Sequence, residues 1–249
     1  SYYPIPMDGP VGRMINHIVL FSWPVVVLIL FRRCSAGVAV AVSIVAGSLL
    51  LPRSPSFNPP LLPTIEKDTI PALAALVMAA ALAGRASRPG GAAAAAAGNG
   101  ILPGWLPRPL LMRLLLLLLL VGSFLTVLTN QDTIVRGGTV LPGERLYGAF
   151  SAILTFIMTM LPFVLARKFL SDDRGHRVLL GVLAVAGLVY SIPVLYEIRM
   201  SPQLSRMIYG YFPHDWIQHM RDGGFRPVVF LEHGLWLAIF MASAFLAAL

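Results

Sequence analysis

The sequence is a succession of apolar runs, most of them about as long as a lipid bilayer is thick. A helix needs about 17 to 25 apolar residues to cross the hydrocarbon core, where the backbone finds no water to hydrogen-bond. We therefore predict seven membrane-spanning helices, over residues 15–31, 36–51, 69–84, 109–129, 146–166, 178–197 and 228–249. The expected fold class is an all-α integral membrane protein, a bundle of about seven transmembrane helices that forms one domain over residues 1–249.

The composition supports this fold class and excludes others. Of the 249 residues, 57% are hydrophobic and 12% are charged, which excludes a soluble globular domain. The runs do not alternate as membrane β-barrel strands do, and Leu114 to Leu120 is an unbroken leucine block. The net charge is +8, but the basic residues are dispersed among the apolar runs, so membrane lipids and not nucleic acid are the expected partners. The single cysteine, Cys34, excludes a disulfide framework.

The distribution of basic residues predicts an orientation. With seven spans, the loops over residues 32–35, 85–108 and 167–177 share one face and carry nine basic residues in 39 positions. The loops over residues 1–14, 52–68, 130–145 and 198–227 share the other face and carry nine in 77 positions. Basic residues concentrate in short cytoplasmic loops. We therefore expect the denser set in the cytoplasm and the N-terminus outside.

The exterior loop over residues 198–227 is the most informative segment, because it interleaves arginines with aromatic residues. Aromatic side chains anchor a segment at headgroup depth, and an arginine can bind a phosphate through two hydrogen bonds. Ser201-Pro202 predicts the start of an amphipathic interfacial helix before the last span. The candidate substrate-binding residues in this loop are Arg199, Arg206, His214 and Arg221.

Three further residues lie where the last span is expected to begin. Arg226 follows Gly223-Gly224 and enters the span at once, where an unpaired charge is expensive. Glu232 and His233 are expected about one turn inside this span, paired with Arg226 or with Arg113, or acting in proton transfer. Arg226 and His233 are the candidate catalytic residues, although a buried network with a purely structural role remains an alternative. No nucleotide-binding or metal-binding motif is present in the sequence, so neither a metal nor a cofactor is expected.

The stretches RMSPQL and GGFRPVVFLEHG, together with LLPTIEKDTIPALAAL, VLTNQD and MLPFVLARKFL, resemble the O-antigen ligase-like family of polytopic bacterial inner-membrane proteins, in particular a largely uncharacterised branch. The resemblance implies transfer of a glycan from an undecaprenyl-pyrophosphate carrier to a lipid acceptor on the periplasmic face. It implies that Arg226 contacts the carrier's pyrophosphate. It also implies several more spans and a periplasmic loop with a histidine that activates the acceptor, whereas this sequence ends at Leu249. We therefore expect that the chain is truncated, or that it is a shortened relative.

Two hypotheses of function follow. The first is a metal-independent membrane glycosyltransferase of inverting type. The second is a non-catalytic membrane subunit or lipid-binding component of a larger membrane complex, which docks through this loop and through its leucine-rich faces. A transporter is a third and weaker alternative, because the matching broken helices of an alternating-access design are missing from the sequence.

Overall fold

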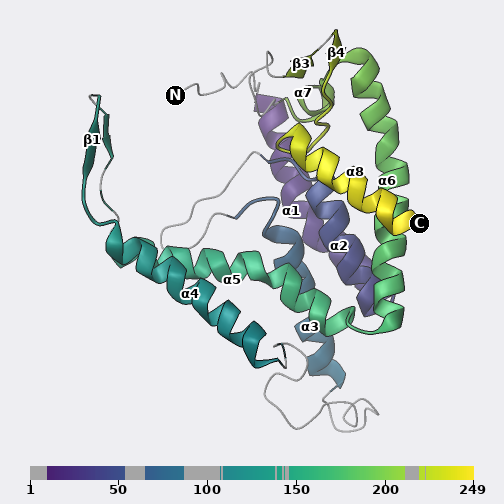
Figure 1. Cartoon of the computed structure of the whole chain (residues 1–249). Helices are drawn as coiled ribbons and strands as arrows, with labels where there is room; N and C mark the ends of the chain where they lie inside the picture. The colour runs from purple at the N-terminus through teal and green to yellow at the C-terminus, as the bar shows by residue number, and fades with distance from the viewer. Residues whose placement is uncertain are drawn as a thin grey trace.

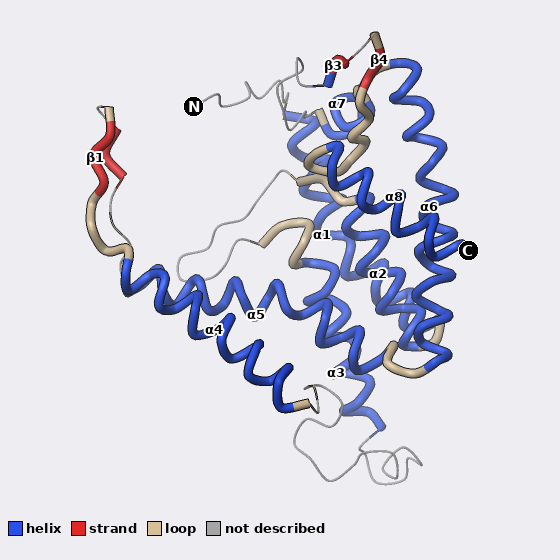
Figure 2. Tube along the Cα trace, in the orientation of Figure 1, coloured by secondary structure: helices blue, strands red, loops and turns tan. Residues whose placement is uncertain are grey.

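The computed structural model describes residues 10–53, 65–86, 107, 109–137, 139–141, 143, 146–210, 219–221 and 223–249. These residues form helices and two short hairpins (Figures 1 and 2). The helices are α1 (Pro10–Arg33), α2 (Ala36–Leu50), α3 (Ile70–Ala86), α4 (Leu110–Thr129), α5 (Leu146–Phe169), α6 (Asp173–Met200), α7 (Leu204–Tyr209) and α8 (Gly234–Ala248). The antiparallel hairpins pair β1 (Ile134–Arg136) with β2 (Thr139–Leu141), and β3 (Met220–Arg221) with β4 (Gly224–Phe225).

Every apolar run of the sequence forms a helix, and four helices are long and apolar enough to cross a membrane. These four cover Met14–Arg33, Leu110–Thr129, Gly148–Phe169 and Asp173–Met200. The protein is therefore a helical membrane protein. The remaining apolar helices, Ala36–Leu50, Ile70–Ala81 and Gly234–Ala248, are shorter, and at 1.5 Å per residue each reaches less than the ~30 Å of the hydrocarbon core.

The largest departure from the predicted spans is at the last one. Helix α8 begins at Gly234 and not at Val228, so Glu232 and His233 precede the helix. The prediction that these two residues lie one turn inside the span is wrong. The reason is that hydrogen bonds from elsewhere in the fold hold the backbone of residues 228–230 in a non-helical course, as described below.

Helix α2 lies at the centre of the bundle, although it is one of the shortest helices. It contacts α1, α3, α5 and α6, and buries Ala39, Val40, Ala41, Ser43, Gly47 and Leu49. Its small residues allow close approach: a Cβ added to Gly47 would lie 2.3 Å from Cγ of Pro71 at the start of α3. Leu20, Val27 and Leu165 complete the main core from α1 and α5. Small residues at such contacts are typical of membrane helix pairs, which gain stability by packing.

Helices α4 and α5 form a hairpin. The second half of α5 packs against α2 and α3, whereas the end of α4 and the start of α5 extend away from the other helices (Figure 1). Helix α4 packs along α5, and only 6% of the most apolar stretch of α4 is buried inside the protein. Leu111, Leu114 and Leu118 are among its exposed side chains. The leucine block within this predicted span therefore points its apolar side chains outward, away from the other described residues.

Helix α8 crosses α6 near the middle of both helices. A Cβ added to Gly187 of α6 would lie 2.4 Å from Cβ of Ala244 in α8. Tyr190, one turn further along α6, packs edge-on against Phe240 of α8 with the ring centroids 5.8 Å apart. Val229, in the segment before α8, shares a buried cluster with Tyr190 of α6 and Leu237 of α8, and the candidate site lies beside this cluster.

Candidate functional site

The carboxylate of Glu197, near the end of α6, organises the chain on both sides of it. Its Oε1 accepts a hydrogen bond from the backbone N–H of Leu204 at 3.0 Å. Its Oε2 accepts from the backbone N–H groups of Val228 at 2.9 Å and Val229 at 2.7 Å. Glu197 therefore ties the start of α7 and the segment before α8 to the end of α6. We call this arrangement the Glu197 clamp.

Burial explains why the clamp needs all these bonds. Glu197 is 1% exposed, and a buried carboxylate costs several kcal/mol unless hydrogen-bond donors replace the water that it has lost. Backbone N–H groups that donate to a carboxylate form short and strong hydrogen bonds. The buried carboxylate is thus stabilised by three backbone N–H groups that form no hydrogen bond within a helix. The same three bonds fix the positions of these backbone groups.

The backbone is strained at two residues beside the clamp. Val229 has a φ of 57° and Ser201 has a φ of 81°, both in a region that L-residues with a side chain rarely adopt. For a β-branched residue such as valine this is a true outlier. Such residues cost about 1–3 kcal/mol each and persist only where the surroundings enforce them, and they cluster at functional sites. The Glu197 clamp supplies that enforcement.

Tyrosine hydroxyls link the same region to α2. The hydroxyl of Tyr190 donates to the carbonyl oxygen of Leu49 at 3.1 Å and accepts from the backbone N–H of Phe230 at 3.2 Å. The hydroxyl of Tyr209 donates to the carbonyl oxygen of Leu50 at 2.5 Å. Residues 228–230 therefore donate all three backbone N–H groups to side chains of α6. The positive φ of Val229, which a right-handed helix cannot contain, keeps this segment from extending α8 toward its N-terminus.

The two candidate catalytic residues flank this held segment. Arg226 is half-buried and lies across the first residue of α8: a Cβ added to Gly234 would be 2.4 Å from Nε of Arg226. His233 caps α8, because its Nδ1 accepts a hydrogen bond from the backbone N–H of Leu235 at 3.1 Å. A neutral imidazole whose Nδ1 accepts carries its proton on Nε2. In this geometry His233 is thus a donor and a helix cap.

The candidate substrate-binding arginines whose side chains the structure describes are both exposed. Arg199 lies in the last turn of α6, and Arg206 lies on α7. The backbone of Arg221 belongs to β3, which pairs with β4 through a turn at Gly223, where φ is 78°. The side chain of Arg221 and the whole of His214 lie outside the described residues.

A short helix, α7, forms where the sequence predicts an interfacial helix, but its details differ. Its N-cap is Gln203 and not Ser201. It buries Ser205 and Tyr209 and exposes Met207. The buried face is set by the Tyr209 hydroxyl bond described above and by Asn16 of α1, whose amide donates to the carbonyl oxygen of Tyr209 at 2.9 Å. The apolar face therefore points outward, as an interfacial helix requires.

The predicted partners of Glu232 were wrong. Glu232 forms an ion pair with Arg53, which follows α2, and Arg113 instead donates from Nε to the carbonyl oxygen of Pro107 at 2.6 Å. Sequence analysis missed Arg53 because 179 positions separate it from Glu232. The side chains of Arg53 and Glu232 are 34% and 41% exposed, so the pair contributes at most about 1 kcal/mol to stability.

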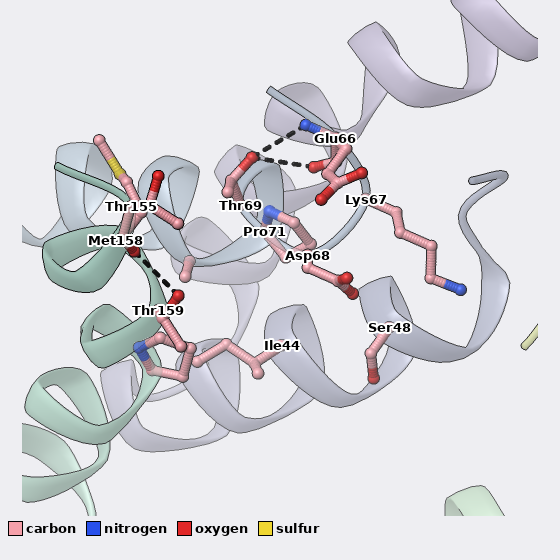
Figure 3. Close-up of a pocket in the computed structure, with 12 residues that line it drawn as sticks. Ile44, Ser48, Glu66, Lys67, Asp68, Thr69, Pro71, Thr155, Met158 and Thr159 are labelled. Carbon is pink, nitrogen blue, oxygen red and sulfur yellow. Dashed lines mark hydrogen bonds between the residues drawn. The ribbon is translucent and has the colours of Figure 1, made fainter. Parts of the chain in front are cut away.

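Arg53 and Glu232 belong to a larger charged cluster that also contains Glu66, Lys67 and Asp68 between α2 and α3. This cluster lies at the mouths of two pockets. One pocket, of about 450 Å³, opens between α2, α3 and α5 and combines the charges with an apolar wall that includes Ile44 and Met158 (Figure 3). The other pocket, of about 350 Å³, lies between α2 and α8 and is lined by both members of the ion pair.

Lys67 separates the two pockets. Its side chain is 3% exposed, extends away from Thr155 and Thr159 in Figure 3, and donates from Nζ to the carbonyl oxygen of Phe230 at 2.9 Å. Burial lowers the pKa of Lys67 to about 8, against the opposing effect of Asp68. Burial also raises the pKa of Glu66, although Arg53 acts in the opposite direction. The charged cluster therefore contains two groups, Glu66 and Lys67, that lie outside the helices and have shifted pKa values.

The arrangement suits an amphiphilic ligand, because apolar pocket walls meet charged groups at one end of the bundle. Among the described residues, no group of three His, Cys, Asp or Glu side chains could hold a metal ion. Comparison with known proteins gives no family model, curated protein or solved structure that matches this chain. The fold and the site thus define a polytopic helical membrane protein with a charged cluster and a clamped loop at one end.

Proposed function

We propose that this protein transfers a glycan from a polyprenyl-pyrophosphate carrier to an acceptor, without a metal or nucleotide sugar. The observation that supports the proposal most is the Glu197 clamp together with strained Val229. The fold uses a buried carboxylate and an unfavourable backbone conformation to hold the short segment that carries Arg226. Sites that bind a transition state need such fixed side chains, held by a supporting shell.

In the proposed reaction, the hydroxyl oxygen of the acceptor forms a bond to the anomeric carbon of the glycan. The bond from that carbon to the pyrophosphate breaks, the pyrophosphate leaves with the electron pair of that bond, and the acceptor's proton passes to water. Arg226 would bind the pyrophosphate and stabilise the negative charge that develops on it as it leaves. His233, which keeps its proton on Nε2 while it caps α8, would act as a donor to the same anion. Arg199, Arg206, Arg221 and His214 remain candidates for carrier contacts.

The proposal includes an orientation in the bacterial inner membrane. All seven apolar helices would be embedded, with α2, α3 and α8 supported by their neighbours, and the N-terminus and the clamped loop would face the periplasm. The close approach of Gly37 to the carbonyl oxygen of Phe169 supports the grouping of residues 32–35 with residues 167–177 at one end. The basic residues of that end favour the cytoplasm.

The direct test measures glycan transfer from carrier to acceptor in proteoliposomes. Arg226→Ala should reduce turnover by about a hundredfold or more, as removal of a group that stabilises a developing anion does. Gly234→Ala, whose added Cβ would displace the Arg226 side chain, should reduce turnover with little loss of stability. Arg174→Ala, at the other end of α6, is the matched control. Full turnover by the Arg226→Ala protein would remove Arg226 from the mechanism.

A second candidate function, a non-catalytic subunit of a membrane complex, is favoured by α4. Its leucine-rich surface is almost entirely uncovered within the described part of the chain, and an exposed apolar helix is a possible docking surface for another membrane helix. Gentle purification distinguishes the two functions. A stoichiometric companion protein, together with no glycan transfer in its presence, would favour the subunit.

A further inference from the structure

An apolar groove runs along the outside of the bundle between α2 and α6, away from the charged cluster. Its volume is about 510 Å³, and its walls include Val42 and Ala46 of α2 and Gly181, Val182 and Val185 of α6. A Cβ added to Gly181 would meet nothing within 4 Å, whereas Gly187 in the same helix is in tight contact with α8. The helices therefore leave space between them at Gly181, at a position where a larger side chain would fill it.

The groove is about as long as one leaflet of a bilayer is thick. Along α6 it extends from Arg177 to Tyr190, which at 1.5 Å per residue is about 20 Å. Half of the hydrocarbon core is about 15 Å. Helix α6 as a whole has 28 residues and so measures about 42 Å, which matches a bilayer with its headgroups. Arg177, one turn from the start of α6, therefore lies at headgroup depth with the apolar walls extending inward from it.

The charge at this end of the groove selects the headgroup. Residues 32–35 and 166–177 carry six basic and two acidic side chains. Of the two acids, Asp172 accepts a hydrogen bond from the backbone N–H of Gly175 at 2.8 Å and caps α6. Arg177 is exposed and is the charged residue that lines the groove. An arginine in this position binds phosphate oxygens through paired hydrogen bonds.

We propose that this groove binds an anionic phospholipid, with one acyl chain between α2 and α6 and the phosphate on Arg177. Inside a membrane the apolar walls gain little by the hydrophobic effect, because the chain leaves one apolar surrounding for another. The groove therefore provides the shape that orders the chain, and Arg177 provides the preference for negative charge. The inference does not depend on the glycan-transfer function, because neither Arg226 nor any residue of the charged cluster lines the groove.

The test uses the purified full chain, equilibrated with vesicles of equal amounts of phosphatidylglycerol and phosphatidylcholine and then analysed by native mass spectrometry. The wild-type protein should retain one phosphatidylglycerol in preference to phosphatidylcholine. Arg177→Gln should reduce this preference by about fivefold, the effect of one basic residue at an anionic membrane surface. Gly181→Leu should abolish retention of either lipid in the groove, because its side chain would occupy the open space.

Matched controls separate a site from general lipid adhesion. Arg174→Gln removes an exposed arginine that does not line the groove, and Gly122→Leu adds the same side chain to an open position of α4; neither should change retention. Inorganic phosphate added at increasing concentration distinguishes recognition of the lipid from recognition of phosphate alone, and release of the lipid by phosphate would overturn the proposal. Unchanged retention by Gly181→Leu, with an unchanged melting temperature, would also overturn it.

Discussion

Replacement of Glu197 tests the clamp most directly. Glu197→Ala would leave the backbone N–H groups of Leu204, Val228 and Val229 without their acceptor. An unsatisfied buried donor costs about 1–3 kcal/mol, but removal of the buried charge offsets part of the loss, so we expect a net destabilisation of about 3–5 kcal/mol. Glu197→Gln keeps one acceptor oxygen and turns an NH₂ toward the remaining donors, and should cost about 1–3 kcal/mol.

Hydrogen exchange read by mass spectrometry measures the effect where it arises. Since each 1.4 kcal/mol is tenfold in an equilibrium constant, peptides that cover residues 198–233 should exchange about a hundredfold faster or more in Glu197→Ala. Glu197→Gln should show a smaller increase. Peptides of α4 should change little, because α4 packs along α5. Asp132→Asn, at an exposed carboxylate, is the control. Exchange in residues 198–233 that is equal in all four proteins would refute the clamp.

Two further predictions concern Lys67 and Gly47. The pKa of Lys67 is lowered from 10.5 to about 8 in the folded protein, so the unfolded state binds more protons between these pH values and the stability of the protein should rise with pH there. The melting temperature of the Lys67→Met protein should lack that rise. Melting temperatures of the wild-type and Lys67→Met proteins that change in parallel with pH would contradict the assignment. Gly47→Ala should lower stability by about 1–3 kcal/mol, because its Cβ would overlap Pro71. Gly122 has open space around it, so Gly122→Ala should be neutral or stabilising by about 0.5–1 kcal/mol. Equal melting temperatures of the Gly47→Ala and Gly122→Ala proteins would argue against close packing of α2 on α3.

The helical part of the fold could be predicted from the sequence because membrane helices satisfy their own backbone. Apolar length alone located each helix, and the bounds of α2 and α4 agree with the predicted spans to within one residue at each end. The two hairpins were not predicted, because β1, β2, β3 and β4 are only two or three residues long. Runs of that length carry no usable alternation.

The site was harder to predict, because its interactions join distant segments. Glu197 was taken as the end of a span, although a lone acid at the end of a long apolar run is itself a signal. The donors to Glu197 are backbone N–H groups, which every residue except proline has, so the residue types at these positions do not indicate the hydrogen bonds. The pairing of Arg53 with Glu232 likewise depends on how α2 and α8 meet. Arg226 was identified by its place after Gly223-Gly224, and its packing against Gly234 is a contact that only the folded chain reveals.

The short last helix gives the clamp a consequence beyond this loop. With 15 residues, α8 measures about 22 Å, whereas a helix that continued through residues 228–249 would measure about 33 Å. The apolar side chains of Val228 to Leu231 would suit such an extension, and what opposes it is the backbone conformation of this segment. Val229 has a φ of 57°, and the amides of Val228, Val229 and Phe230 donate to side chains of α6. The clamp and the strained valine that it holds therefore set where α8 begins, and they shorten this apolar helix by about 11 Å.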